Sequence, residues 1–330
     1  MDWMPVNHHI KIPKWALGAV FTATLVILGA VFALPTNAAP RPVAAQTPNV
    51  CLDQVGIPVE DFHWTYIPES PDQLYTEERY FFLAGELIQA GVVDASDCPA
   101  GGLMLNGYAN ACGMSRALET VIVLQNILNE PILQAWDDVG VPPVLLKRLI
   151  ATESQFWPSR FDPVHYGYGH VTNLGLRNAI QWNPRLRTMV CPPGVDCVES
   201  FAAAEQILAT LVATCPECEY GIDTEAAFRS VEILAEILLG YCYQTAQLVA
   251  NATGWRADLA VNYATIWKLT LMNYNSGSQC TYETLLSTFA FTQGPMNWSD
   301  ISARVTGGCG RGLWYANDIT APYFDFPPAE

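Results

Sequence analysis

The sequence predicts a mainly α-helical, disulfide-bonded protein that is carried across a membrane. Apolar residues recur at helical spacing through most of residues 115–330, whereas alternating strand-like runs are few. All ten cysteines follow residue 50, and an even number of cysteines is typical of disulfide-bonded exported proteins. A long uncharged stretch stands near the N-terminus. These three observations define the expected class of protein.

The N-terminal residues predict the compartment. Lys11 and Lys14 precede nineteen uncharged residues that end at Leu34. At about 1.5 Å per residue these nearly span a bilayer core of roughly 30 Å, and the positive-inside rule places the rest of the chain outside. An uncleaved membrane anchor fits the length, and a cleaved signal peptide fits the small residues around Ala38. We therefore expect residues 1–34 to direct the rest to an extracytoplasmic location, anchored or secreted.

The chain then divides by composition. Residues 35–50 are rich in Pro and Ala and predict a linker. Residues 51–114 predict a small accessory segment, either a separate module or an N-terminal wrap, with a helix near Glu77–Ala90 and a turn at Gly101-Gly102. We expect residues 115–330 to form the main domain.

Helices follow one another in that domain. Ser115 is expected to cap the first helix, Pro131 to break or kink it, and Pro142-Pro143 to open the next. Three later segments have helical period: Phe201–Ala213, Glu225–Val249 and Ala257–Met272.

The cysteines predict a disulfide framework, with a local bridge between Cys191 and Cys197 as a plausible member and the other pairings open. The cysteines are Cys51, Cys98, Cys112, Cys191, Cys197, Cys215, Cys218, Cys242, Cys280 and Cys309. A zinc site formed by Cys191, Cys197, Cys215 and Cys218 is the alternative, which an oxidising compartment disfavours.

The net charge of the chain limits the classes of molecule that it is expected to bind. Acidic residues number 32 against 16 basic ones, which gives a net charge of −16. Nucleic acids and anionic surfaces are bound by clustered Lys and Arg, so we expect no nucleic-acid partner. A carbohydrate remains compatible, because sugars are bound by hydrogen bonds and aromatic stacking, and ten Trp and fourteen Tyr are present.

Glu153 is the candidate catalytic residue. Leu145, Leu149 and Glu153 are spaced i, i+4 and i+8, so a carboxyl group continues an apolar stripe. Pro158 ends the helix soon afterwards, which leaves Glu153 near its C-terminal end. Desolvation and the helix dipole both penalise the ionised form there. A glutamic acid kept protonated in this way suits a general acid for a glycosidic oxygen.

Two further segments accompany Glu153. A glycine-rich turn over residues 165–175 follows its helix, and residues 272–277 end a later helix in polar, turn-forming residues. In this order the three segments resemble the transglycosylase domain of soluble lytic transglycosylases and the related goose-type lysozymes. The resemblance covers about residues 115–319.

Three motifs carry the resemblance. Glu153-Ser154 matches the family's Glu-Ser. Gly169-His170-Val171-Thr172 aligns with Gly-Leu-Met-Gln, with Thr172 in place of Gln. Tyr274-Asn275-Ser276-Gly277 matches Tyr-Asn-x-Gly, preceded here by Asn273 instead of Ala. Tyr315 is the candidate for a late aromatic near the active site.

The resemblance implies a lysozyme-like helical domain with a cysteine-rich insertion near residues 185–222. It implies cleavage of peptidoglycan strands between N-acetylmuramic acid and N-acetylglucosamine, with a 1,6-anhydro product and neither cofactor nor metal. Glu153 would be the single acid and base, and Ser154 would orient it. The substrate would be bound by Gly169, His170, Thr172, Tyr274, Asn275 and Tyr315.

Three alternatives stay open. If Asp162, Asp300 or Asp318 lies close to Glu153, lysozyme-type hydrolysis becomes the better interpretation. A non-catalytic glycan-binding or envelope-scaffold domain of the same fold would be compatible with Thr172 and with the insertion. A thiol or metal oxidoreductase based on Cys215-x-x-Cys218 is the third.

Overall fold

The computed structural model describes residue 51 and residues 63–322, which belong to one compact unit spanning residues 48–330. The expected targeting segment and linker lie outside the described residues. The helices are η1 (His63–Thr65), η2 (Pro71–Leu74), α2 (Phe81–Gln89), η3 (Pro99–Gly102), α3 (Ala111–Ile127), α4 (Asn129–Val139), α5 (Pro143–Ser154), α6 (Asn173–Trp182), α7 (Pro184–Val190), α8 (Phe201–Ala209), α9 (Thr224–Thr253), α10 (Ala257–Ala260), α11 (Tyr263–Thr292), α12 (Trp298–Ser302), η4 (Gly307–Cys309) and α13 (Gly310–Ile319).

The mainly α-helical class is confirmed. Extended pairing within the described residues is limited to isolated bridges, of which Arg160–Tyr166 and Tyr166–Val171 form a short hairpin between α5 and α6. Among the described helices, only α9 is long and apolar enough to cross a membrane, and 78% of its apolar window is buried inside the protein. A buried core helix can have the same length and apolar composition as a membrane-spanning helix, and α9 is buried in this way.

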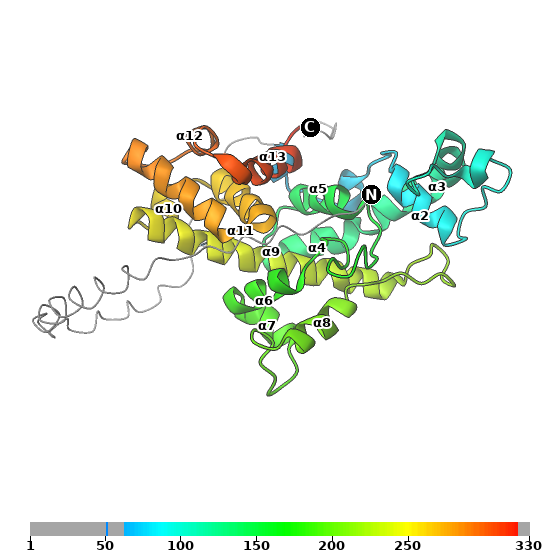
Figure 1. Cartoon of the computed structure of the whole chain (residues 1–330), viewed down its shortest axis with the longest axis horizontal. Coiled ribbons are helices and arrows are strands. Elements are labelled where there is room, and N and C mark those ends of the chain that lie inside the picture. The colour runs from blue at the N-terminus through cyan, green and yellow to red at the C-terminus, as the bar shows by residue number, and fades with distance from the viewer. Residues whose placement is uncertain (1–50, 52–62, 323–330) are drawn as a thin grey trace, which may run out of the picture. The chain divides into compact units, whose positions relative to one another are not determined.

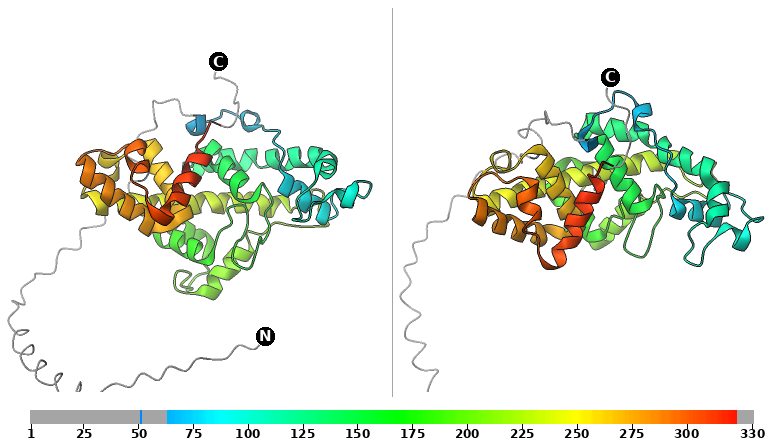
Figure 2. Two further views of the ribbon diagram at one scale, coloured as in Figure 1. Left: turned by 45° about the horizontal axis from the view of Figure 1, so that its top comes forward. Right: turned by 90° about the horizontal axis from the view of Figure 1, so that it is seen from above.

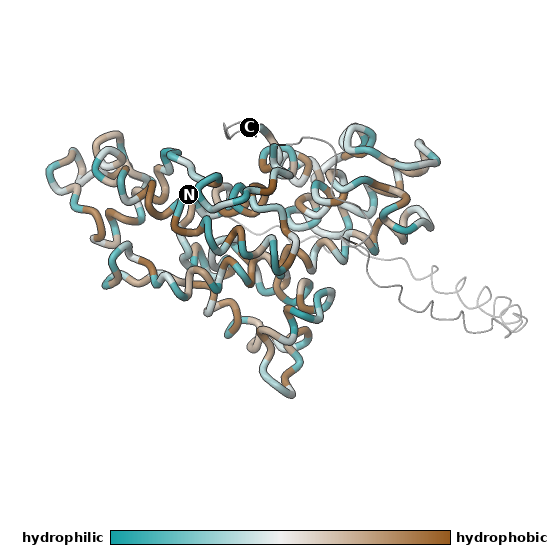
Figure 3. The backbone as a smooth tube through the Cα atoms, turned by 180° about the vertical axis from the view of Figure 1, so that it is seen from behind, coloured by the Kyte–Doolittle hydropathy of each residue, from teal (hydrophilic) through white to brown (hydrophobic). Residues whose placement is uncertain are grey.

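The core is built around α9. Figure 1 shows α9 crossing the middle of the described residues with α4, α6 and α11 packed around it. Gly240 allows α6 to approach α9 closely, since a Cβ there would lie 2.7 Å from the carbonyl oxygen of Ala179 on α6. Figure 3 shows hydrophobic stretches recurring along the helices between hydrophilic residues, as expected for helices with a buried face.

Helix α5 is buried on nearly all sides. It opens at Pro142-Pro143 as predicted, with Pro142 as N-cap and Pro143 as the first residue. Residues 143–150 are all buried, including Lys147 and Arg148. The Lys147 ammonium donates to the carbonyl oxygen of Leu74 and to the side chains of Asn126 and Asn129. A buried amino group is tolerated here because acceptors surround it.

The first helix of the main domain starts earlier than predicted. Asn110, not Ser115, is the N-cap of α3, and its side chain accepts from the backbone N–H of Gly113. Both residue types cap helices, and only the hydrogen bond decides between them. The helix ends at Ile127, and Pro131 lies in the first turn of α4, where no helical N–H is lost.

The later helices differ from prediction at their ends. The predicted helix at residues 257–272 is divided at Asn262, whose side chain caps a new helix by accepting from the N–H of Thr265. That helix, α11, continues to Thr292 through a kink at Gly277. Helix α8 stops at Ala209, whereas α9 extends to Thr253, where Gly254 adopts a positive φ.

The structure pairs the ten cysteines with none left free. The pairs are Cys51–Cys242, Cys98–Cys112, Cys191–Cys197, Cys215–Cys218 and Cys280–Cys309. The expected local bridge between Cys191 and Cys197 is among them. Cys215 and Cys218 bond to each other and not to the other two cysteines of the alternative zinc site.

Candidate functional site

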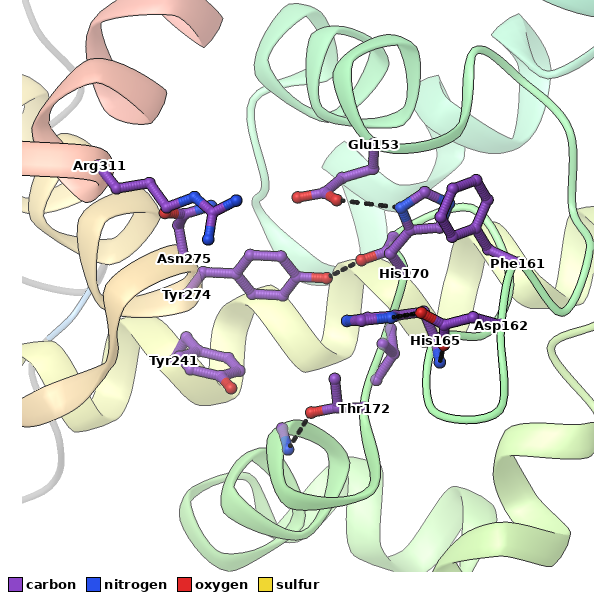
Figure 4. Close-up of a pocket in the computed structure, with 13 residues that line it drawn as sticks. Glu153, Phe161, Asp162, His165, His170, Thr172, Tyr241, Tyr274, Asn275 and Arg311 are labelled. Atoms are coloured by element: carbon purple, nitrogen blue, oxygen red, sulfur yellow. Dashed lines mark hydrogen bonds and ion pairs between the residues drawn. The ribbon is translucent and has the colours of Figure 1, made fainter. Parts of the chain in front are cut away.

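A pocket of about 300 Å³ lies where the end of α5, the hairpin after it, and helices α9, α11 and α13 meet (Figure 4). Its lining is mostly polar or aromatic. It consists of Glu153, Phe161, Asp162, His165, Gly169, His170, Val171, Thr172, Gly175, Tyr241, Tyr274, Asn275 and Arg311. The pocket therefore brings together residues of all three motifs.

Glu153 is the second-last residue of α5. The helix ends at Ser154, the next residue, because Gln155 and Phe156 adopt positive φ angles of 45° and 66°. The Glu153 side chain is 16% exposed. One carboxylate oxygen accepts a hydrogen bond from the Tyr315 hydroxyl, and the other lies 3.5 Å from Nδ1 of His170. The carboxyl group is thus largely shielded, with two partners and an open side toward the pocket.

Three tyrosines, Tyr241, Tyr274 and Tyr315, pack in a row and form one wall of the site, and Tyr315 at one end of the row contacts Glu153. The Tyr274 ring lies 5.1 Å from that of Tyr241 and 6.5 Å from that of Tyr315, measured between centroids. Burial, followed by the nearby charge of Glu153, raises the pKa of both Tyr274 and Tyr315 well above the ordinary value. Both phenols therefore stay neutral and act as hydrogen-bond donors.

The Gly169 turn fits closely against this wall. The Tyr274 hydroxyl donates to the carbonyl oxygen of Gly169. A Cβ at Gly169 would lie 2.4 Å from the Leu234 side chain and 2.8 Å from the Tyr274 oxygen, so any larger residue would have to displace one of these side chains. His170 follows with a positive φ of 46°, an uncommon conformation for a residue with a side chain. This turn directs the His170 ring toward Glu153 (Figure 4).

Helix α13 completes the site. It lies between α11 and α5, as Figure 2 shows from two further directions. Gly312 permits the close approach, since a Cβ there would lie 2.6 Å from the Ser276 hydroxyl on α11. The same helix carries Tyr315, which contacts Glu153, and Arg311, which lines the pocket beside Asn275 (Figure 4).

Two predicted residues have other roles in the structure. Ser154 is buried outside the pocket, and its hydroxyl donates to the carbonyl oxygen of Ile150 in the preceding turn, so it does not orient the Glu153 carboxylate. Tyr315 and His170 contact that carboxylate instead. Thr172 does line the pocket, but its hydroxyl is occupied as the N-cap of α6, accepting from the N–H of Gly175.

Of the three possible second acids, only Asp162 lines the pocket. Its carboxylate accepts from the backbone N–H groups of Val164 and His165 and lies 2.8 Å from Nδ1 of His165. Asp300 instead forms a capping box at the start of α12. Asp318 lies near the end of α13 and does not line the pocket.

Sequence reasoning missed three pocket residues, Phe161, Tyr241 and Arg311, and named His165 only as part of the glycine-rich turn. Tyr241 lies within α9 and has the spacing of a core residue. Arg311 lies outside every motif. His165 offered one signal, the Asp162-x-x-His165 spacing that puts a carboxylate and an imidazole in one tight turn.

Within the described residues, no group of three or more His, Cys, Asp or Glu side chains could hold a metal ion. Comparisons of the chain with protein-family models, with curated proteins and with solved structures found no match.

Proposed function

We propose that this protein is an extracytoplasmic enzyme of lysozyme-like fold that cuts peptidoglycan glycan strands as a lytic transglycosylase. Glu153 is its acid group. The proposal rests on one observation: a shielded glutamic acid at a helix end faces the Tyr274-Asn275 turn across a pocket open to a ligand. The order and types of these residues resemble the transglycosylase motifs.

The chemistry follows from the surroundings of Glu153. In its protonated state the carboxyl group donates to the oxygen that bridges two sugars, and the bond to that oxygen breaks. The carboxylate that remains is stabilised by the Tyr315 hydroxyl. Asn275 offers both a donor and an acceptor, which suits an N-acetyl group. As the muramyl O6 hydroxyl bonds to the anomeric carbon and closes the 1,6-anhydro ring, it releases its proton, which the Glu153 carboxylate accepts in the single-acid scheme of the transglycosylases.

Hydrolysis in the manner of lysozymes is the second candidate. It is favoured by Asp162, a second carboxylate in the same pocket. Two-carboxylate glycosidases use the second group as a nucleophile or as a base for water. A non-catalytic glycan-binding domain of the same fold would retain the pocket and lack turnover.

The test is to incubate purified protein with peptidoglycan and to identify the products by mass spectrometry. We expect 1,6-anhydro ends from the parent protein, a loss of at least about 100-fold in Glu153→Gln, and no loss in the exposed control Glu283→Gln. Products with reducing ends would favour the hydrolase. Strands that the protein binds but does not cut would favour the non-catalytic binding domain. Parental cleavage by Glu153→Gln would show that the acid group is assigned wrongly.

A further inference from the structure

A carboxylate–imidazole pair lies in the pocket beside Glu153. His165 and Asp162 occupy one turn of the hairpin after α5, and Nδ1 of His165 lies 2.8 Å from the Asp162 carboxylate. Two backbone N–H groups hold that carboxylate in place. The hydrogen bond from the backbone of Val164, and after it the hydrogen bond from the His165 side chain, lower the pKa of Asp162 below its ordinary value. Asp162 is therefore an ionised acceptor.

An ionised acceptor at Nδ1 fixes the tautomer of the ring. The hydrogen on neutral His165 stands on Nδ1, so Nε2 carries a free lone pair. Nε2 makes no hydrogen bond to any residue in the described ranges, and Figure 4 shows it directed into the pocket on the side of Tyr274. A nitrogen held in this way can accept a proton from a ligand.

The pair is separate from the acid group. His170 lies between them, with its Nδ1 3.5 Å from Glu153 and its ring centroid 6.1 Å from that of His165. Other titratable or charged groups around the pocket come from the hairpin and from α9, α11 and α13. They are Arg160, Tyr241, Tyr274, Arg311 and Tyr315. The pocket thus presents an acid and an imidazole at different positions of its wall.

We propose that His165, held by Asp162, is the general base of this site, so that Glu153 acts only as the acid. The attacking hydroxyl gives its proton to Nε2 of His165 while its oxygen bonds to the anomeric carbon. The bond from that carbon to the bridging oxygen breaks, and the bridging oxygen takes the proton of Glu153. A proton then passes from His165 to Glu153 through solvent, which restores both groups. The inference rests on the proposed function.

The first test measures kcat and KM separately in His165→Gln and Asp162→Asn, so that an effect on the reaction is distinguished from an effect on substrate binding. We expect kcat to fall at least about 100-fold in His165→Gln with KM changed little, and the acidic limb of the pH–rate profile to disappear. The exposed His63→Gln is the matched control, and thermal unfolding verifies that each variant folds. The measurement is the same whether the attacking hydroxyl belongs to a sugar or to water. Parental kcat and pH dependence in His165→Gln, with Glu153→Gln inactive, would overturn this inference alone.

A second test needs no turnover. Long-range ¹H–¹⁵N spectra of the parent protein report which ring nitrogen of His165 carries the hydrogen. We expect the Nδ1–H tautomer, with the Nε2 signal shifting when a chitooligosaccharide is added. In Asp162→Asn the tautomer preference should weaken. A hydrogen on Nε2 in the parent protein, or an unmoved Nε2 signal with bound oligosaccharide, would overturn the inference even if no glycan were ever cut.

Discussion

At the scale of single residues, Glu153 was predictable because it violates a pattern. A carboxyl group continues the apolar stripe of Leu145 and Leu149, and both leucines are buried as the stripe requires. Its partners were less predictable. Tyr315 stands 162 positions away and became a candidate only through the resemblance. Ser154, adjacent in sequence, bonds to its own helix because a Ser hydroxyl reaches the carbonyl four residues back.

The Tyr315 hydroxyl is expected to contribute directly to the chemistry. Glu153 becomes a carboxylate when it gives up its proton, and a donor to that charge is worth about 1.5–3 kcal/mol. We therefore expect Tyr315→Phe to lower kcat by about 10- to 100-fold. The control is Tyr75→Phe, an exposed tyrosine whose hydroxyl bonds only to Glu77 among the described residues. Parental kcat in Tyr315→Phe would show that the hydrogen bond is not used in the reaction.

At the scale of elements, the existence of the helices was predictable and their ends were not. Apolar periodicity located α8 and α9, and the Pro142-Pro143 pair located the start of α5. The ends depend on single hydrogen bonds. Asn110 and Asn262 each cap a helix at a position that periodicity alone does not mark. A periodic pattern depends on many apolar residues, whereas the end of a helix depends on a single hydrogen bond between one side chain and one backbone N–H.

The kink at Gly277 offers a test at this scale. Gly277 has φ 84° and ψ 166°, a conformation almost restricted to glycine, and a Cβ there would meet no atom within 4 Å. Gly277→Ala should therefore cost about 1–3 kcal/mol of unfolding free energy through the backbone alone. Denaturant unfolding measures it. Gly308→Ala is the control, since that site is equally open and has no positive φ. Equal effects in the two variants would rule out backbone strain at Gly277.

At the scale of the whole molecule, Cys51 and residues 63–114 share one compact unit with the described helices that follow them. The Cys51–Cys242 disulfide joins them to α9, and the backbone N–H of Phe82 donates to the side chain of Gln155, two residues after Glu153. Weak periodicity suggested an accessory segment because this region has few apolar residues at helical spacing. Its polar contacts, which periodicity does not report, hold it against α5.

Lys147 lies at this junction, and its ionisation makes the stability of the folded protein depend on pH. Burial lowers the pKa of Lys147 to about 7, against an ordinary value of 10.5. Between those pH values the unfolded chain binds a proton that the folded protein has released, so the contribution of this residue to stability rises with pH and is lost as the pH falls through about 7. The free energy of unfolding of the parent, minus that of Lys147→Met, should therefore increase from pH 7 to pH 9.

The slope against pH of this difference in unfolding free energy tests whether Lys147 releases its proton in the folded protein. It should approach about 1.4 kcal/mol per pH unit above pH 7 and flatten below it, since both states are then protonated. Other groups cancel in the subtraction because the two proteins share them. Lys268→Met is a comparison on α11, where partial burial lowers the pKa of the lysine less strongly, and its slope should be shallower. A flat difference for Lys147→Met from pH 7 to pH 9 would mean that the three acceptors around the ammonium keep it charged. The junction between residues 51–114 and α5 would then be held by a permanent buried cation rather than by one that responds to pH.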